Sequence, residues 1–163
     1  MDHCDECGFS YASVAEGALP GRLREFGGRY AAALDEIAQP RRRPAEHVWS
    51  PLEYTCHVRD VFRVQRERLT LALAVDGPEF ASMGRDERVV ADAYNQQDPA
   101  VVLAELADAA SDLAADFSTL GRPELARTGI YPWPVPQTRT LLWLGQHTVH
   151  EGEHHLRDLR RPT

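Results

Sequence analysis

Residues 50–75 carry the strongest structural signal in the chain, because both ends of a long helix are marked there. Ser50 stands at the N-cap position, Pro51 at the first helical position, and Glu53 follows Ser50 by three residues. This is a capping box with the favoured proline. No glycine or further proline interrupts the chain before Gly77. A helix of this length must bury its apolar side against other elements, so those elements decide the fold class.

Three further segments place apolar residues at helical spacing, and no useful run alternates with the period of two that strands show. Residues 121–137 contain four prolines and are expected to form an irregular loop. The prediction is an all-α four-helix bundle of residues 17–163, after a Cys-containing leader of residues 1–16. Besides the first helix described, the expected elements are helices over about 19–37, 99–120 and 138–160, and a short helix over 85–94 in the long connection 76–97.

The charge balance argues against nucleic acid as a partner. The chain has 18 basic and 25 acidic residues, a net charge of −7, and its dense basic run, residues 41–43, lies between two prolines. No secretory signal and no membrane-length apolar run is visible, so we expect a cytoplasmic protein whose partners are small molecules. Three cysteines do not make a disulfide framework.

The last predicted helix carries four of the seven histidines. His150 and His154 are spaced i, i+4, so their side chains leave one face of the helix and can reach one metal ion. The stretch also matches the H-E-x-x-H pattern of zinc peptidases, but the downstream third ligand of those enzymes is missing. If the second and fourth helices are antiparallel neighbours, His57 reaches the same height. We therefore predict a divalent metal held by His57, His150 and His154, with open coordination positions for chemistry.

Other polar residues are candidates for supporting roles. A proton could be moved by His147, Glu151 or Tyr94, and the sequence does not choose among them. Arg85 and Arg139 are candidates to bind a substrate or cosubstrate carboxylate. His155 points about 100° away from His154 and is expected to be packed or exposed. The connection 76–97 and the loop 131–136 are the expected walls of a substrate pocket.

The leader contains Cys4-x-x-Cys7, which has the spacing of a zinc knuckle or a redox pair. A zinc knuckle needs a second pair of ligands, and a redox motif needs a βαβ setting, and neither is recognised in the sequence. The alternatives are a second metal site using His3, Cys4 and Cys7, or a polar leader that packs over the bundle or is partly disordered.

The order and spacing of these motifs resemble the DinB-like superfamily. The resemblance is carried by Trp49-Ser50-x-x-Glu53-x-x-x-His57 and by His150-x-x-x-His154-His155-Leu156-x-Asp158, and the stretch 86–95 followed by Asp98-Pro99 looks like the actinobacterial branch with its mycothiol-dependent enzymes. The resemblance implies a bundle with a long crossover between its second and third helices. It also implies a divalent metal on the positions of His57, His150 and His154, most often zinc, with nickel or iron as alternatives. A mycothiol-like thiol as cosubstrate and a homodimer are further expectations by analogy.

The resulting hypothesis is a metal-dependent thiol S-transferase or thiol-dependent isomerase acting on a small electrophile. A thiol bound to the metal would lose its proton and become the nucleophile. Two alternatives stay open. One is a non-catalytic metal- or ligand-binding stress or sensor protein. The other is a metal-dependent hydrolase, motivated by Glu151 beside His150.

Overall fold

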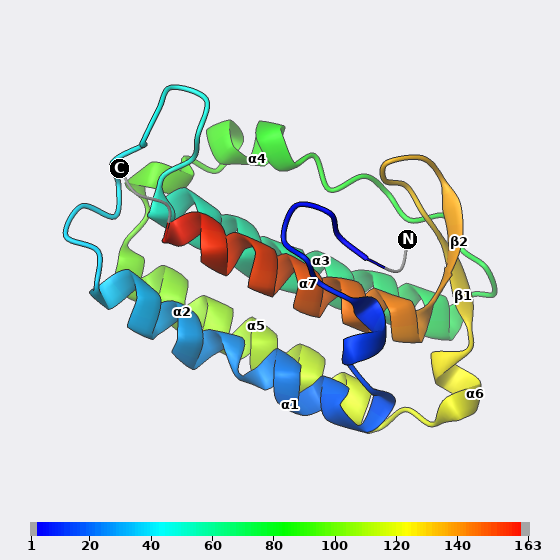
Figure 1. The fold of residues 1–163 in the computed structure, drawn as a ribbon. Coiled ribbons are helices and arrows are strands. Elements are labelled where there is room, and N and C mark those ends of the chain that lie inside the picture. Colours follow the sequence, from blue (N-terminus) through cyan, green and yellow to red (C-terminus); the bar gives the residue numbers. More distant parts are fainter. Residues whose placement is uncertain (1–2, 161–163) are drawn as a thin grey trace.

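The computed structural model describes residues 3–160 and shows a bundle of four helical rods (Figure 1). The first rod consists of α1 (Leu19–Arg24) and α2 (Phe26–Asp35), and the other three are α3 (Pro51–Ala74), α5 (Pro99–Ser118) and α7 (Leu141–Leu159). The predicted all-α bundle and its long crossover between the second and third rods are confirmed. The shorter elements are the 3-10 turns η1 (Tyr11–Ser13), η2 (Glu16–Ala18) and η3 (Tyr94–Gln96), and the short helices α4 (Arg85–Ala91) and α6 (Arg122–Leu125).

The start of α3 has the hydrogen bonds that its sequence predicts. The Glu53 amide donates to the Ser50 hydroxyl at 3.1 Å, and the Ser50 amide donates to the Glu53 carboxylate at 2.7 Å. The guanidinium of Arg43 forms an ion pair with the same carboxylate. These contacts fix the first turn of α3, and with it the height of His57, which lies two turns further along.

The way the rods pack determines which faces meet. α3 packs against α5 and α7, and the first rod packs against the same two helices from the other side. The core between them is apolar, and Phe26 meets Phe62 with ring centroids 5.7 Å apart. Arg127, which follows α6, donates to the carbonyl of Ala72 at the end of α3, and its own carbonyl accepts from the amide of Leu141, the first residue of α7. α3 and α7 are therefore antiparallel neighbours, and the start of α3 lies beside the end of α7. No helix within residues 3–160 is both long and apolar enough to cross a membrane.

The segment expected to be an irregular loop contains α6 and a small antiparallel sheet. Strands β1 (Thr128–Tyr131) and β2 (Gln137–Thr140) pair in the register Thr128 to Thr140 and Tyr131 to Gln137. The prediction was wrong here because each strand is only four residues long, too short to show an alternating pattern, and the prolines are concentrated between the strands. The crossover is tied to this hairpin, since the Phe80 amide donates to the Ile130 carbonyl at 3.0 Å.

Residues 3–16 of the leader lie along α7 (Figure 1, dark blue beside orange and red). Cys7, Tyr11 and Val14 are buried against the bundle. The side chain of Gln146 on α7 donates to the Val14 carbonyl at 3.0 Å, and Arg157 donates to the carbonyl of Cys7. The leader therefore covers one flank of α7, while α3 covers the other.

Candidate functional site

One face of α7 carries a continuous row of groups that can bind metal or protons. The row follows i, i+3 and i+4 spacing, so its members leave the same side of the helix. Two flanks of this row have different neighbours, with α3 on one side and the leader on the other. The members are His147, His150, Glu151, His154, His155 and Asp158.

The flank toward α3 forms a cluster of His57, Glu151 and His155, whose donor atoms lie within 4.8 Å of one another. Glu151 Oε2 is 4.0 Å from His57 Nε2 and 3.6 Å from His155 Nε2. His57 is buried, and neither of its ring nitrogens has a hydrogen-bond partner. Buried polar atoms normally have partners, so an unpartnered nitrogen aimed at a carboxylate needs an explanation. A divalent ion supplies one, because imidazole and carboxylate are its ordinary ligands.

The charges of this cluster are set by burial and by close carboxylates. Burial lowers the pKa of His57 to about 3, so its imidazole is neutral. Burial also lowers the pKa of His155, but hydrogen bonds to Asp158 and Glu151 outweigh that effect and raise it to about 9. Burial disfavours the charge on Glu151, yet contacts with His150 and His155 hold its pKa well below the usual range. The cluster thus contains a carboxylate facing two imidazoles.

Asp158 fixes the orientation of His155. Its Oδ2 lies 2.8 Å from His155 Nδ1, which leaves Nε2 directed to Glu151. A carboxylate on the far nitrogen of an imidazole is the usual second partner of a metal-binding histidine. The Trp49 ring lies 5.2 Å from that of His57, and the Arg85 guanidinium stacks over Trp49 at 5.3 Å. Arg85 therefore stands at the rim of this cluster.

His147 lies beside the cluster, next to the second oxygen of Glu151. Its Nε2 is 3.7 Å from Glu151 Oε1, and its Nδ1 is 2.7 Å from the hydroxyl of Tyr11. Burial lowers the pKa of His147 to about 4. Its ring stacks on Trp143 at 4.6 Å, and Arg139 stacks over the same tryptophan at 4.7 Å. The structure thus brings His147 and Glu151 together and places Arg139 behind Trp143.

Tyr94 lies in a different part of the fold. It is fully buried, and its hydroxyl donates to Asp60 Oδ2 at 2.5 Å. Its backbone carbonyl accepts from the thiol of Cys56, which neighbours His57 but leaves α3 about 100° around the helix. The structure therefore does not bring Tyr94 together with His147 and Glu151. Its neighbours are the residues of a small apolar cluster, Leu52, Cys56, Val89 and Val102.

The three histidines of the predicted ligand set are also not brought together. Within residues 3–160, His57 groups with Glu151 and His155, whereas His150 and His154 group with Cys4 and Cys7 of the leader. Each residue of a helix is rotated by about 100° from the previous one, so the i, i+4 pair that faces α3 is the one that begins at Glu151. His155, expected to be packed or exposed, faces His57 with ring centroids 4.9 Å apart.

Sequence reasoning also missed Tyr11 and the position of the leader cysteines. Tyr11 gave no signal, because a single aromatic residue in a polar leader has no pattern to read. The cysteines did give one. Cys4-x2-Cys7 and His150-x3-His154 have the two spacings found in Cys2His2 zinc sites, although almost the whole chain separates them.

Together these features define a class of protein, a four-helix bundle with a buried histidine–carboxylate cluster between its second and fourth rods. The chain belongs to the DinB superfamily, whose family model matches residues 23–159. That range includes His57, Glu151 and His155 and leaves Cys4 and Cys7 outside it. No curated protein matches the chain.

The fold is similar to a solved structure, that of YfiT from Bacillus subtilis. The two chains share 19% identity with a TM-score of 0.80, and the match covers 89% of this chain and 83% of that chain. YfiT is described as "a probable metal-dependent hydrolase with an unusual four-helix bundle topology". At this identity the likeness establishes a common fold.

Proposed function

We propose that the chain is a metal-dependent hydrolase whose divalent ion is held by His57, Glu151 and His155. The observation that carries the proposal is His57, which is buried with both ring nitrogens unpartnered and with Nε2 facing a carboxylate. Two histidines and one glutamate are the protein ligands of several hydrolytic zinc sites, and they leave a coordination position open. The description of YfiT as a probable metal-dependent hydrolase supports the same reaction class.

The residues around the cluster would have different roles in the reaction. A divalent ion bound there would lower the pKa of a coordinated water and stabilise negative charge on a substrate. Asp158 keeps His155 Nε2 directed inward, as its 2.8 Å contact with Nδ1 requires. His147 is neutral near pH 7, so one of its ring nitrogens is free to take a proton. Tyr11 can donate to Nδ1 or accept from it, which allows His147 to take that proton at Nε2.

The surroundings suit a small substrate with an anionic group. Aromatic rings border the cluster, with Trp49 against His57 and Tyr54 against His155 at 5.4 Å. Arg85 and Arg139 stack over Trp49 and Trp143, so a cation stands near each end of the row of histidines. These arginines are the groups we propose to attract a carboxylate or phosphate on the substrate.

Thiol transfer, with mycothiol or a similar thiol as cosubstrate, is the second candidate. The observation that favours an external thiol concerns Cys56, the cysteine adjacent to His57. Burial raises its pKa to about 12, and its Sγ is directed to the Tyr94 carbonyl, away from the cluster. A thiolate is the reactive form of cysteine, so Cys56 is not a nucleophile for this site. In a thiol-transfer mechanism, the nucleophilic sulfur would therefore belong to the cosubstrate.

The test compares metal content and turnover in the purified full-length chain. By elemental analysis, His57→Ala, His155→Ala and Glu151→Gln should each contain about one metal ion per chain less than wild type. Glu153→Gln is the matched control, because Glu153 forms ion pairs with Arg22 and Arg29 away from the cluster. The control should keep its metal. If His57→Ala keeps full metal content, the proposed site is wrong.

Activity then separates the candidate functions. Wild-type protein is assayed on a panel of small anionic esters and amides, with and without added mycothiol. Hydrolysis without thiol supports the hydrolase. Turnover that requires the thiol supports the transferase instead. Full metal content without turnover in either assay would favour a non-catalytic metal-binding protein.

A further inference from the structure

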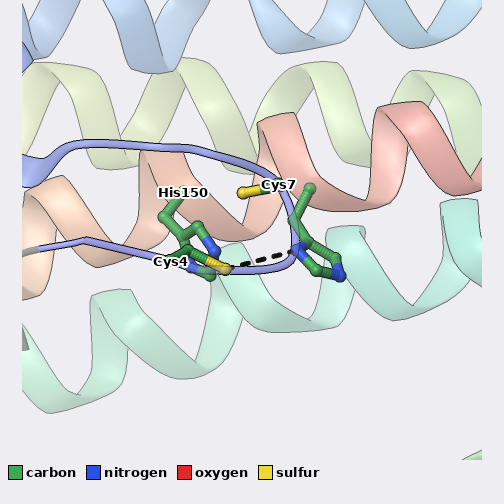
Figure 2. A group of neighbouring side chains, drawn as sticks. Cys4, Cys7 and His150 are labelled. Carbon is green, nitrogen blue, oxygen red and sulfur yellow. Dashed lines mark hydrogen bonds between the residues drawn. The ribbon is translucent and has the colours of Figure 1, made fainter.

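We propose that the leader and α7 form a second metal site, a closed zinc site with Cys4, Cys7, His150 and His154 as its four ligands. Donor atoms of all four side chains lie within 4.8 Å of one another. Figure 2 shows the leader turn carrying Cys4 and Cys7 across α7 beside His150. Two thiolates and two imidazoles in tetrahedral arrangement are a standard structural zinc site, and the spacings C-x2-C and H-x3-H are typical of it. This site does not depend on the proposed hydrolase activity.

The leader is folded so that both thiols face the helix. The Gly8 amide donates to the Cys4 carbonyl at 2.8 Å, and the Cys4 amide donates to the Phe9 carbonyl at 2.9 Å, which closes a tight reversal. Gly8 has φ of +72°, a conformation that glycine adopts without steric strain. Zinc binds cysteine in its thiolate form.

The histidines present a nitrogen to the cysteines and hold the other one elsewhere. His154 Nδ1 lies 3.9 Å from Cys4 Sγ, while its Nε2 lies 3.4 Å from a carboxylate oxygen of Glu6. His150 Nδ1 lies 3.4 Å from the Tyr11 hydroxyl, while its Nε2 is buried and has no hydrogen-bond partner. A metal-binding histidine ordinarily has this arrangement, with one nitrogen on the metal and the other held by a hydroxyl or carboxylate.

The second site also explains why a polar leader stays on the bundle. Tyr11 and Val14 bury apolar surface near the end of the leader, whereas the turn from Cys4 to Gly8 has no large apolar side chain, and so short a segment does not order itself without a strong fastening. Zinc binding supplies folding free energy directly, because the unfolded chain has no preformed site. The fastening places Phe9 and Tyr11 over α7, with Tyr11 against His147, which lies beside the first cluster. The zinc site is thus a clamp that closes one side of the proposed active site.

Cobalt substitution tests the ligands directly, because only thiolate ligands give an intense near-ultraviolet charge-transfer band with Co²⁺. The full-length wild-type protein, loaded with Co²⁺ under anaerobic conditions, should show the band. Cys4→Ser and Cys7→Ser should lose it. The matched control Cys56→Ala removes a cysteine outside the cluster and should keep it. His57→Ala should also keep it, so failure of the first site and failure of this one are distinguishable.

A second measurement needs no variant and covers the case in which the serine variants do not fold. In zinc-loaded wild-type protein, Cys4 and Cys7 should resist alkylation, and a chelator should make both reactive within the folded chain. Peptide mass spectrometry identifies the modified cysteines. The proposal is overturned if loaded protein shows no thiolate band, if the band survives Cys7→Ser, or if Cys4 and Cys7 are joined as a disulfide in metal-loaded protein.

Discussion

Glu151 is the residue at which the two clusters of α7 meet. Its Oε2 faces His57 and His155, and its Oε1 lies 3.4 Å from Nδ1 of His150. One carboxylate therefore contacts both flanks of the helix, as a proposed ligand on one and as the neighbour of a proposed ligand on the other. Substitutions of Glu151 should disturb both sites, and the residues further from this junction are better tools for separating them.

Asp158 gives the sharper test of the first site. Asp158→Asn keeps the shape of the side chain and removes the charge that orients His155, so the affinity for the metal should fall about 10–100-fold. Competition with a chromophoric chelator measures this, in a Cys7→Ser background that leaves the first cluster as the remaining site. Asp112→Asn, on the exposed face of α5, is the control and should change nothing. Equal affinities in the two variants would show that Asp158 does not orient the ligand.

The residue scale also shows where sequence reasoning stops. The i, i+4 rule selects residues on one face of a helix, and it correctly placed the polar row of α7. It does not decide which of two overlapping pairs, His150 with His154 or Glu151 with His155, points to α3. That choice depends on the rotation of α7 about its own axis. The apolar residues of α7 on the opposite face, among them Val149 and Leu156, set this rotation by packing into the core.

At the scale of single elements, the start of α3 links sequence to stability most directly. Burial raises the pKa of Glu53, but the Arg43 guanidinium and the Ser50 amide outweigh that effect and leave it below its usual value. The folded state therefore favours the charged form. Its contribution to stability is present above the unfolded pKa of about 4.3 and is lost as pH falls through the lower folded pKa.

Glu53→Gln should accordingly destabilise the protein by about 1–2 kcal/mol at pH 7, because the capping bond and the ion pair with Arg43 are weakened. The difference from wild type should shrink as pH falls from 5 toward 3, where wild type also loses the charge. Urea unfolding at several pH values measures it. Glu67→Gln, at an exposed position of the same helix, should show little effect at any pH. If the loss of unfolding free energy in Glu53→Gln did not change with pH, the stabilising role of the ionised Glu53 carboxylate would be contradicted.

The contact between α2 and α5 depends on a missing side chain. A Cβ added at Gly27 would lie 2.8 Å from the Cβ and 2.9 Å from the Cα of Ala107, and a backbone atom cannot move aside easily. Gly28 has nothing within 4 Å of the same position. Adjacent glycines are unfavourable inside a helix, yet Gly27 is what lets the first rod approach α5.

Neighbouring alanine substitutions should therefore have opposite signs. Gly28→Ala should stabilise the protein by about 0.5–1 kcal/mol through helix propensity. Gly27→Ala should destabilise it by about 1–3 kcal/mol through overpacking against α5. Chemical denaturation of both variants beside wild type is the measurement. Stabilisation by both would mean that the two helices are further apart than the structure places them.

For the whole molecule, the helices of the bundle could be predicted from the sequence, but the contacts of the leader could not. Helix starts at Ser50 and Asp98 are local signals, so the order and lengths of the rods follow from short stretches of chain. The contact of Cys4 with His154 joins residues 150 positions apart. No local pattern specifies such a contact, and the two halves of a C-x2-C and H-x3-H site were interpreted separately for that reason.

The stability of the loaded molecule should be divided between a metal-dependent leader and a bundle that holds together without it. The amides of Cys4 and Gly8 are hydrogen-bonded within the reversal of the leader, so they should be protected from hydrogen exchange. A chelator should release these amides first, while amides in α3 and α5 keep their protection, because the helices bury the main core. The expected effect is a loss of leader protection before any global unfolding.

The thermal midpoint follows the same logic. A site at one thousand times its dissociation constant stabilises the folded state by about 4 kcal/mol, so chelation should lower the midpoint by roughly 10 °C. In Cys7→Ser the leader amides should exchange rapidly with or without metal, and the chelator should then act through the first cluster alone, giving a smaller shift. If chelation instead unfolds leader and bundle together in one step, the leader is part of the cooperative core, and the zinc site stabilises the whole fold rather than clamping one flank of α7.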